Sequence, residues 1–294
     1  MAADSLKKAG HKIDIYIHDI TSASEDPALL VSEGKLDSTD LIIGAVPVKD
    51  IPVLADHANN RQINFVSALS AADAGVQGNP YFTMVHPSLK THCESIAAEI
   101  TAKYAGQKVI MFYRRSSELD SLGLKYFTGA PGIEKVEIKR RLCTVAPSKD
   151  KLVTAIDTGK VNVVVMPILD ITYADSLLKI LSANFPGTRF EVYGMPAWND
   201  MMFSAAKKKA RPNLSLHYTT PFSFDLSSPS AKYVAKMYKK DYGGKPTDLV
   251  YRGYETMFWY AGLLKKYGTV FNERYNDNAG APFTKFEVKP RWDR

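Results

Sequence analysis

The chain alternates short apolar runs with longer amphipathic stretches, which is the pattern of β/α units. Its clearest part predicts strand, helix, strand and strand in turn, at Asp40–Gly44, Val48–Asn59, Ile63–Ser67 and Tyr81–Val85. Consecutive units of this kind form a parallel, doubly wound sheet whose ligands lie beyond the carboxyl ends of the strands. The loops Ala45–Lys49 and Ala68–Asp73 are therefore the first places to look for a bound molecule.

A second β/α alternation follows. The apolar strands Lys108–Tyr113 and Asn162–Pro167 carry no polar interruption, as expected where helices cover both faces of a parallel sheet. The remaining predicted elements are helices at Pro87–Tyr104, Glu118–Thr128, Lys149–Thr158 and Tyr173–Asn184 and extended segments at Lys135–Leu142 and Arg189–Gly194. We therefore expect an α/β fold of two doubly wound parallel-sheet domains, the second with its own sheet around Asn162–Pro167.

The two ends of the chain add fewer elements. Ala2–Ala9 predicts a short helix that Gly10 ends, and His11–Ile20 alternates in the manner of a strand. Near the other end, an extended Leu214–Asp225 precedes two helices, Pro229–Tyr242 and Leu249–Tyr267. The tail from Asn272 onward is polar and irregular. A helix at the very start would ordinarily follow a strand, so we expect the sequence to lack a first strand.

Length and composition allow two domains of about 150 residues. The 294 residues are 45% hydrophobic and 23% charged, as in ordinary soluble globular proteins. No apolar run approaches the roughly 20 residues that span a bilayer, so no membrane span is predicted. The opening MAADSLKKAG lacks the basic and apolar regions of a signal peptide. The chain is therefore either cytoplasmic or a fragment without its export signal.

A formal charge of +7 raises the question of nucleic-acid binding. The basic residues are spread along helices, and the one dense cluster is Lys207–Lys209 with Arg211, a size typical of a solvated face. We therefore predict no nucleic-acid partner. Cys93 and Cys143 are too few for a disulfide framework, and two buried thiols are the simplest expectation, although one bridge stays open.

Motifs for catalysis, nucleotide binding and metals are missing from the sequence. It contains no G-x-G-x-x-G, no G-x-x-x-x-G-K-[ST], no G-x-S-x-G and no H-E-x-x-H. Its six histidines show no metal-ligand spacing apart from His86 and His92. We predict no catalytic residues, no metal and no cofactor.

Four segments carry a family resemblance: DLIIG, then A-x-x-A-N-x-R-x-I-x-F-V-S-x-L-S, then NPYF, then HPS. In this order they resemble the type I periplasmic binding protein superfamily, the leucine-type amino-acid receptors. The resemblance implies two hinged lobes, residues 1–85 with 220–280 and residues 86–219. It also implies that residues 281–294 lead to a further crossing absent from the sequence, and that the protein works in the periplasm or cell envelope.

The resemblance also implies a ligand-binding site in the cleft between the lobes. Ser67, Ala68 and Ser70 fall on the loop that holds the ligand carboxylate, where small residues let N–H groups and hydroxyls converge; a plain tight turn is the alternative. Other positions depart from the receptors. Val48 lies near the position where the receptors carry a second serine, and Leu119 lies where they carry an aromatic residue that covers the ligand. Asp170 lies in a turn that bears tyrosine in the receptors.

The remaining implied ligand contacts follow the strand Arg189–Gly194. Trp198 and Asn199 lie in the turn where the receptors carry an acidic partner for the ligand ammonium, and Asp200 is the nearest acid here. The Trp198 ring either stacks on a ligand or packs under Met201–Phe203. Without that acid, the site suits an anionic or neutral ligand with a hydrophobic body better than an α-amino acid.

Two function classes therefore stay open. The first is a non-catalytic solute receptor that captures an amino-acid-like or other carboxylate ligand for ABC-type transport or sensing, with a membrane transporter as partner. The second is a ligand-free envelope module that binds a cell-wall synthesis protein. An enzyme on the same fold is a third and weaker alternative, because fold does not fix function.

Overall fold

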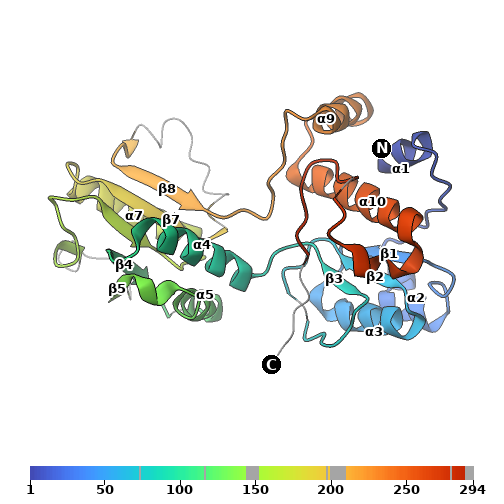
Figure 1. The fold of residues 1–294 in the computed structure, drawn as a ribbon, viewed down its shortest axis with the longest axis horizontal. Helices are drawn as coiled ribbons and strands as arrows, with labels where there is room; N and C mark the ends of the chain where they lie inside the picture. The colour runs from blue at the N-terminus through green and yellow to red at the C-terminus, as the bar shows by residue number, and fades with distance from the viewer. Residues whose placement is uncertain are drawn as a thin grey trace. The chain divides into compact units, whose positions relative to one another are not determined.

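The computed structural model describes residues 1–72, 74–115, 117–143, 152–196, 198, 210–278 and 280–288. It divides into two compact units (Figure 1). Unit 1 is Met1–His86 with Phe222–Arg294, and unit 2 is Pro87–Pro221. Each unit has its own parallel sheet, of three strands in unit 1 and five in unit 2 among the described residues. The prediction of separate doubly wound sheets is confirmed.

The sheet of unit 1 has the order β1 (Leu41–Gly44), β2 (Asn64–Ser67) and β3 (Phe82–Met84). Side chains alternate across β2, so Phe65 joins the apolar cluster of α2 (Pro27–Ser32) and α3 (Ile51–Arg61). Val66 points to the other face and joins the cluster of α10 (Asp248–Tyr267). The sheet is therefore covered by helices on both faces.

Shorter elements complete unit 1. Helix α1 (Ala2–Lys8) ends as predicted at Gly10, whose φ of 78° lies in the left-handed region. Helix α9 (Pro229–Tyr242) matches its predicted bounds and begins with the Ser228 hydroxyl capping its first turn. The 3₁₀ turns are η1 (Ala23–Glu25), η2 (Val48–Asp50) and η5 (Gly268–Arg274).

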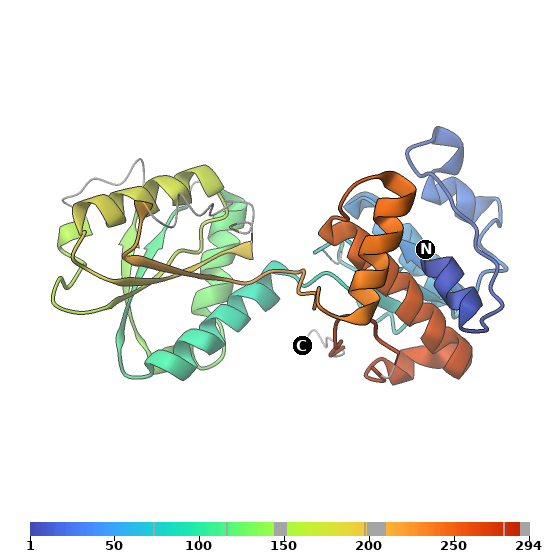
Figure 2. The ribbon, with the colours of Figure 1, turned by 90° about the horizontal axis from the view of Figure 1, so that it is seen from above.

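The sheet of unit 2 has the order β5-β4-β6-β7-β8. Its strands are β4 (Lys108–Tyr113), β5 (Glu137–Leu142), β6 (Asn162–Val165), β7 (Phe190–Gly194) and β8 (Leu214–Tyr218). Every residue of the central strand β6 is buried, which explains its uninterrupted apolar sequence. Figure 2 shows α7 (Ile171–Asn184) on one side of this sheet and α4 (Leu89–Tyr104) on the other. Helix α5 (Glu118–Thr128) and the 3₁₀ turn η3 (Ile133–Lys135) pack beside α4.

The predicted strand His11–Ile20 is wrong. No strand forms there, and Ile15, Tyr16 and Ile17 are exposed to 41%, 73% and 88%. Alternation makes a segment able to form a strand, but a strand exists only where a neighbouring strand accepts its hydrogen bonds. Among the described residues, none pairs with this segment.

The predicted helix Lys149–Thr158 is confirmed at Leu152 and Val153, the first of its residues that the structure describes, and is wrong from Thr154 onward. Residues 144–151 lie outside the described part of the chain, and after Leu152 and Val153 the chain turns. The Asn162 side chain accepts from the Asp157 N–H at 2.9 Å and donates to the Asp157 carbonyl at 2.8 Å. These side-chain bonds replace the helical ones and hold the turn.

Two further expectations concern cysteines and membranes. Cys93 and Cys143 are both buried and no disulfide joins them, as expected. Burial raises the pKa of the Cys93 thiol to about 12. None of the helices in the described residues has the length and apolar character needed to span a membrane.

Candidate functional site

Arg114 lies at the carboxyl end of β4, between two carboxylates from different elements. Its Nε is 3.5 Å from Asp120 Oδ2, and its Nη1 donates to Asp170 Oδ2 at 2.9 Å. The guanidinium also lies over the Tyr173 ring, 4.3 Å from the ring centroid. This group, which we call the Arg114 cluster, is the best-defined polar arrangement at the carboxyl edge of the unit 2 sheet.

Local sequence holds each member of the Arg114 cluster in place. Ser117 caps α5 by accepting from the Asp120 N–H, which fixes Asp120 in the first turn. Asp120 is 1% exposed, and its Oδ1 accepts from the Leu169 N–H at 2.9 Å. Asp170 caps α7 by accepting from the Tyr173 N–H at 3.0 Å. The cluster therefore joins the loops that follow β4 and β6.

The electrostatics of the cluster favour an ionised Asp170. The hydrogen bond from the Tyr173 N–H, followed by the one from Arg114, lowers the pKa of its carboxyl group. Burial, with a contribution from Cys143, raises the pKa of the Tyr173 hydroxyl. The Asp170 side chain is 45% exposed and therefore reaches solvent. Each of its two oxygens accepts one hydrogen bond, from Arg114 and from the Tyr173 N–H.

Leu119 lies beside this cluster, and its side chain is 56% exposed at the start of α5. An exposed leucine at this edge is accessible to an apolar ligand body, and its predicted ligand contact stays a prediction. Nothing in the structure places a ligand against it.

The structure places Trp198 in the core of unit 2. The side chain is fully buried, and its Nε1 donates to the Ile168 carbonyl at 3.0 Å. A Cβ on Gly194 would lie only 2.1 Å from the indole ring, so the ring packs directly on the β7 backbone. In this conformation the indole face is closed to a ligand. The predicted contact Asn199, the nearby Asp200 and Met201–Phe203 lie outside the described residues.

The loop after β2 forms the corresponding edge of unit 1. Its backbone continues the sheet, because the Ala68 N–H donates to the Gly44 carbonyl at 2.9 Å. Ser67 is fully buried, and its hydroxyl makes no hydrogen bond with any described residue. Ala68 is 8% exposed. Ser70 is partly exposed, and its hydroxyl closes a turn with the Ala72 backbone.

Val48 belongs to the neighbouring loop of unit 1, after β1. It opens the 3₁₀ turn η2 and is 48% exposed. The described carboxyl edge of unit 1 therefore presents an exposed valine together with the partly exposed Ser70, whereas Ser67 and Ala68 support the loop from beneath.

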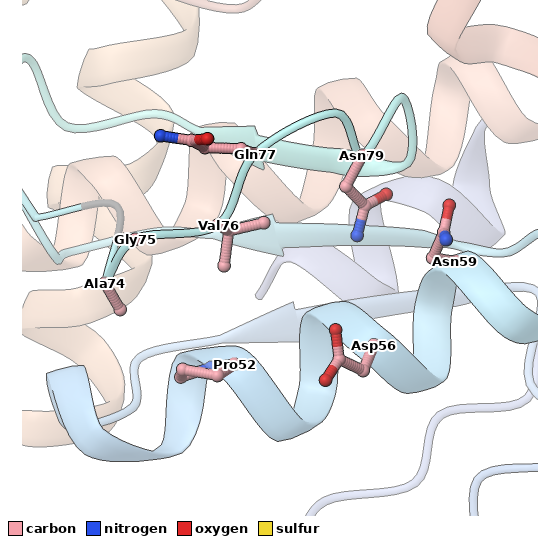
Figure 3. A pocket seen from close by; sticks show the side chains of 8 residues that line it. All are labelled: Pro52, Asp56, Asn59, Ala74, Gly75, Val76, Gln77 and Asn79. Atoms are coloured by element: carbon pink, nitrogen blue, oxygen red, sulfur yellow. The ribbon is translucent and has the colours of Figure 1, made fainter.

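A separate cavity of about 310 Å³ lies in unit 1 between α3 and the loop before β3 (Figure 3). It contains none of the predicted site residues. Figure 3 shows the Asp56 carboxylate pointing from α3 toward the loop and the Asn79 amide pointing back. Asn79 donates to the Ala55 carbonyl at 2.7 Å, so it ties the loop to the helix. The lining residues are Pro52, Asp56, Asn59, Ala74, Gly75, Val76, Gln77 and Asn79.

Sequence reasoning identified Asp170 but missed Arg114 and Asp120. The sequence held a signal for this ion pair, because two neighbouring strands of a parallel sheet bring the loops that follow them together. Strands β4 and β6 pair directly, with Met111 opposite Val165. Arg114 directly follows β4, and Asp170 lies in the loop after β6, so opposite charges in these two loops predict an ion pair. Among the described residues, no three His, Cys, Asp or Glu side chains gather as a metal site requires.

No protein-family model matches this sequence, and no curated protein matches it either. Several solved structures match this chain. A putative branched-chain amino acid ABC transporter from Rhodospirillum rubrum matches with a TM-score of 0.70 and 15% identity over 97% of this chain and 88% of that one. An ABC transporter substrate-binding protein from Desulfitobacterium hafniense in complex with Leu matches with a TM-score of 0.61 and 14% identity over 97% and 86%.

A third solved structure is also similar to this chain. The branched-chain amino acid transporter substrate binding protein from Streptococcus pneumoniae, in complex with isoleucine, has a TM-score of 0.52 and 16% identity over 98% of this chain and 84% of that one. The chain has the type I periplasmic binding protein fold. In this fold the two α/β units described above are the two lobes, and both candidate edges are the carboxyl ends of lobe sheets.

Proposed function

We propose that this chain is a non-catalytic solute-binding protein that takes a small carboxylate for ABC-type transport or for sensing. The observation that carries the proposal is the likeness to the Rhodospirillum rubrum structure, which extends over 97% of this chain with a TM-score of 0.70 and includes both units. The three matches given above are an ABC transporter protein, an ABC transporter substrate-binding protein and a transporter substrate binding protein.

The ligand contacts that we propose lie, in each unit taken by itself, at the carboxyl edge of its sheet. In unit 1, the loop of Ala68 and Ser70 brings small residues to a carboxylate, with Ser67 supporting it, and the partly exposed Ser70 hydroxyl would turn from the Ala72 carbonyl to donate to the ligand. Val48 adds exposed apolar surface to this edge of unit 1, and Leu119 is exposed at the edge of unit 2. In unit 1, a polar loop near an exposed valine suits a ligand with one anionic end and an aliphatic body.

The state of Asp170 supports a ligand without an ammonium group. Its two oxygens already accept from the Tyr173 N–H and from Arg114, and Arg114 offsets its charge. A buried ligand ammonium needs a carboxylate whose charge is not already offset by another cation, since an unpaired buried charge is costly. At the unit 2 edge, the charge of Asp120 is likewise offset by Arg114 at 3.5 Å, and the carboxylate is 1% exposed although its Oδ2 makes no hydrogen bond with any described residue.

The proposed function also implies a location in the cell. A protein that delivers solutes to an ABC transporter works in the periplasm or at the cell surface, with the membrane transporter as its partner. The alternative of a ligand-free module for a cell-wall protein receives no specific observation in its favour.

A thermal-shift screen tests the proposal. The panel contains aliphatic carboxylates, amino acids, sugars, nucleobases and cell-wall fragments. A ligand present at a hundred times its dissociation constant stabilises the folded state by about 2.7 kcal/mol, which is readily seen as a rise in melting temperature. We expect the aliphatic carboxylates to give the largest shift. A screen in which no compound shifts the melting temperature would contradict a solute-binding role.

A further inference from the structure

The cavity of unit 1 between α3 and residues 74–79 contains none of the residues proposed for the carboxylate ligand (Figure 3). Its volume of about 310 Å³ lies at the lower end of the range for pockets that hold small molecules. One wall is a single face of α3, because Pro52, Asp56 and Asn59 follow one another at spacings of four and three residues. This wall therefore presents an apolar ring, a carboxylate and an amide in a row.

Residues 74–79 form the opposite wall, and both ends of this loop are fixed. Ala74 and Gly75 have φ angles of 53° and 76°, in the left-handed region. Alanine adopts this conformation only at a cost in free energy, and such positions cluster at ligand-binding sites. At the other end, Asn79 donates to the Ala55 carbonyl at 2.7 Å, and between the two ends Val76 packs against the apolar cluster of α2 and α3. The loop therefore keeps its shape beside the helix.

Asp56 carries the charge of this cavity, and Figure 3 shows its carboxylate pointing from α3 toward the loop. With the residues that the structure describes, this carboxylate makes neither a hydrogen bond nor an ion pair. No lysine or arginine lies on α3 within one turn of it. The nearest lysine and arginine in sequence, Lys49 and Arg61, pair instead with Asp50 and Asp37. Asp56 is therefore available to a cation from outside the chain.

We propose that this cavity binds a small alkylguanidinium compound. A guanidinium is planar and presents its N–H donors as a fork, which suits acceptors that stand side by side better than the point charge of an ammonium does. Asp56 and Asn59 form such a row on α3, and the Asn59 side chain has no hydrogen-bond partner within the described parts of the chain. Pro52 and Val76 offer apolar surface to the alkyl chain. A guanidinium bound here touches no residue of the Ser70 loop, so the two sites are independent.

A nuclear magnetic resonance titration of the isotope-labelled full chain with n-butylguanidinium tests the site. The matched probe n-butylurea has nearly the same shape and the same alkyl chain but no charge. We expect n-butylguanidinium to bind with a dissociation constant on the order of 1 mM, since the compound is small and the carboxylate is exposed. The amide signals of Asn59, Val76 and Gln77 should shift during the titration. n-Butylurea should bind at least about tenfold more weakly, because it lacks the charge-assisted hydrogen bond.

Two substitutions change the charge of the site in opposite directions. Asp56→Asn removes the carboxylate and should weaken the binding of n-butylguanidinium by about tenfold. Asn59→Asp adds a second carboxylate and should tighten it. Both side chains are exposed on α3, so neither change should prevent folding. The matched control Asp241→Asn removes an exposed carboxylate from α9 and should leave the dissociation constant unchanged.

Four results would overturn the guanidinium site. The first is that n-butylguanidinium shifts no amide signal of residues 74–79 at about ten times the expected dissociation constant. The second is equal binding of n-butylurea, which would show that charge is not recognised. The third is unchanged binding to both Asp56→Asn and Asn59→Asp. The fourth is equal weakening by Asp56→Asn and by Asp241→Asn, which would show a general attraction to surface carboxylates.

Discussion

Arg252 donates to Glu255 Oε2 at 3.1 Å inside unit 1, where the two side chains are only 6% and 0% exposed. Both belong to α10, and Glu255 Oε1 also accepts from the Thr284 N–H at 2.6 Å. The guanidinium lies between 5.2 and 5.8 Å from three phenylalanine ring centroids. Two of these, Phe222 and Phe224, belong to the segment that enters unit 1 from unit 2. The pair therefore fixes that segment and the C-terminal stretch on one helix.

The first prediction concerns this buried pair. Glu255→Gln leaves the Arg252 charge buried without its partner, so we expect a loss of about 3 to 5 kcal/mol in unfolding free energy. The double variant Arg252→Met/Glu255→Gln removes both charges and keeps an acceptor for Thr284, and it should recover most of the loss. Urea denaturation measures both. Equal stability of Glu255→Gln and the unmodified chain would show that the pair is unimportant.

The same pair has a pH dependence with a definite sign. Burial raises the pKa of the Glu255 carboxyl group above its ordinary value, more than Thr284 and Arg252 lower it. A carboxyl group whose pKa is higher in the folded state favours folding below its unfolded pKa of about 4.3, and loses this contribution as the pH rises through the folded value. Glu255→Gln should remove this component from a plot of unfolding free energy against pH.

The second prediction concerns Asp120 in the Arg114 cluster. Asp120→Ala leaves the Leu169 N–H without its acceptor and Arg114 without its buried partner. We expect a loss of about 2 kcal/mol in unfolding free energy. Asp120→Asn keeps an acceptor for the Leu169 N–H and should lose less. If the two variants were equally stable, the hydrogen bond to Leu169 would not be the cause.

The third prediction concerns Asp170 at low pH. Its pKa is lowered in the folded state, chiefly by the Tyr173 N–H and then by Arg114. A lowered pKa stabilises the folded state above the unfolded value of about 3.9, and this contribution is lost as the pH falls through the folded value. Asp170→Asn should therefore flatten the acid side of the stability profile below about pH 4. An unchanged acid limb would refute the assignment. Solvent exposure of Asp170 keeps the effect small.

The fourth prediction concerns the contact between Gly194 and Trp198. Gly194→Ala would place a Cβ at 2.1 Å from the fully buried ring, so the ring or the β7 backbone must move. We expect a loss of about 3 kcal/mol. The control Gly253→Ala adds a Cβ within α10 with no atom inside 4 Å, and it should stabilise by up to about 1 kcal/mol. Thermal unfolding of the two variants should shift in opposite directions.

The sequence predicted the elements whose structure depends on nearby residues. β6 was recognised because four consecutive buried positions need four apolar or amide side chains, and α9 because it follows a Ser/Pro-rich turn at the end of an extended segment. The segment His11–Ile20 failed for the opposite reason. Its pattern is that of a strand, but strand formation depends on a partner elsewhere in the chain, which the pattern cannot supply.

The candidate site likewise contains residues that the sequence identified and residues that only the folded structure reveals. Asp170 was found through the family resemblance, because its turn corresponds to a tyrosine-bearing turn of the receptors, and the structure makes it the N-cap of α7. Arg114 lies 56 residues earlier, so its bond to Asp170 follows only from the pairing of β4 with β6. Two roles for Trp198 were equally plausible from sequence, since a tryptophan after a strand suits a surface or a core. Its burial and its bond to Ile168 come from packing that the pattern did not specify.

Titration calorimetry with 4-methylpentanoate and with leucine tests the proposed function most directly, because the two compounds share an aliphatic body and a carboxylate and differ in the ammonium group. We predict that 4-methylpentanoate binds more tightly than leucine. Ser70→Ala should weaken its binding, whereas the control Ser176→Ala, whose hydroxyl bonds within α7, should not. Binding of leucine without binding of 4-methylpentanoate would contradict the proposed ligand class, and no heat from either compound would contradict the proposal that this protein binds aliphatic carboxylates.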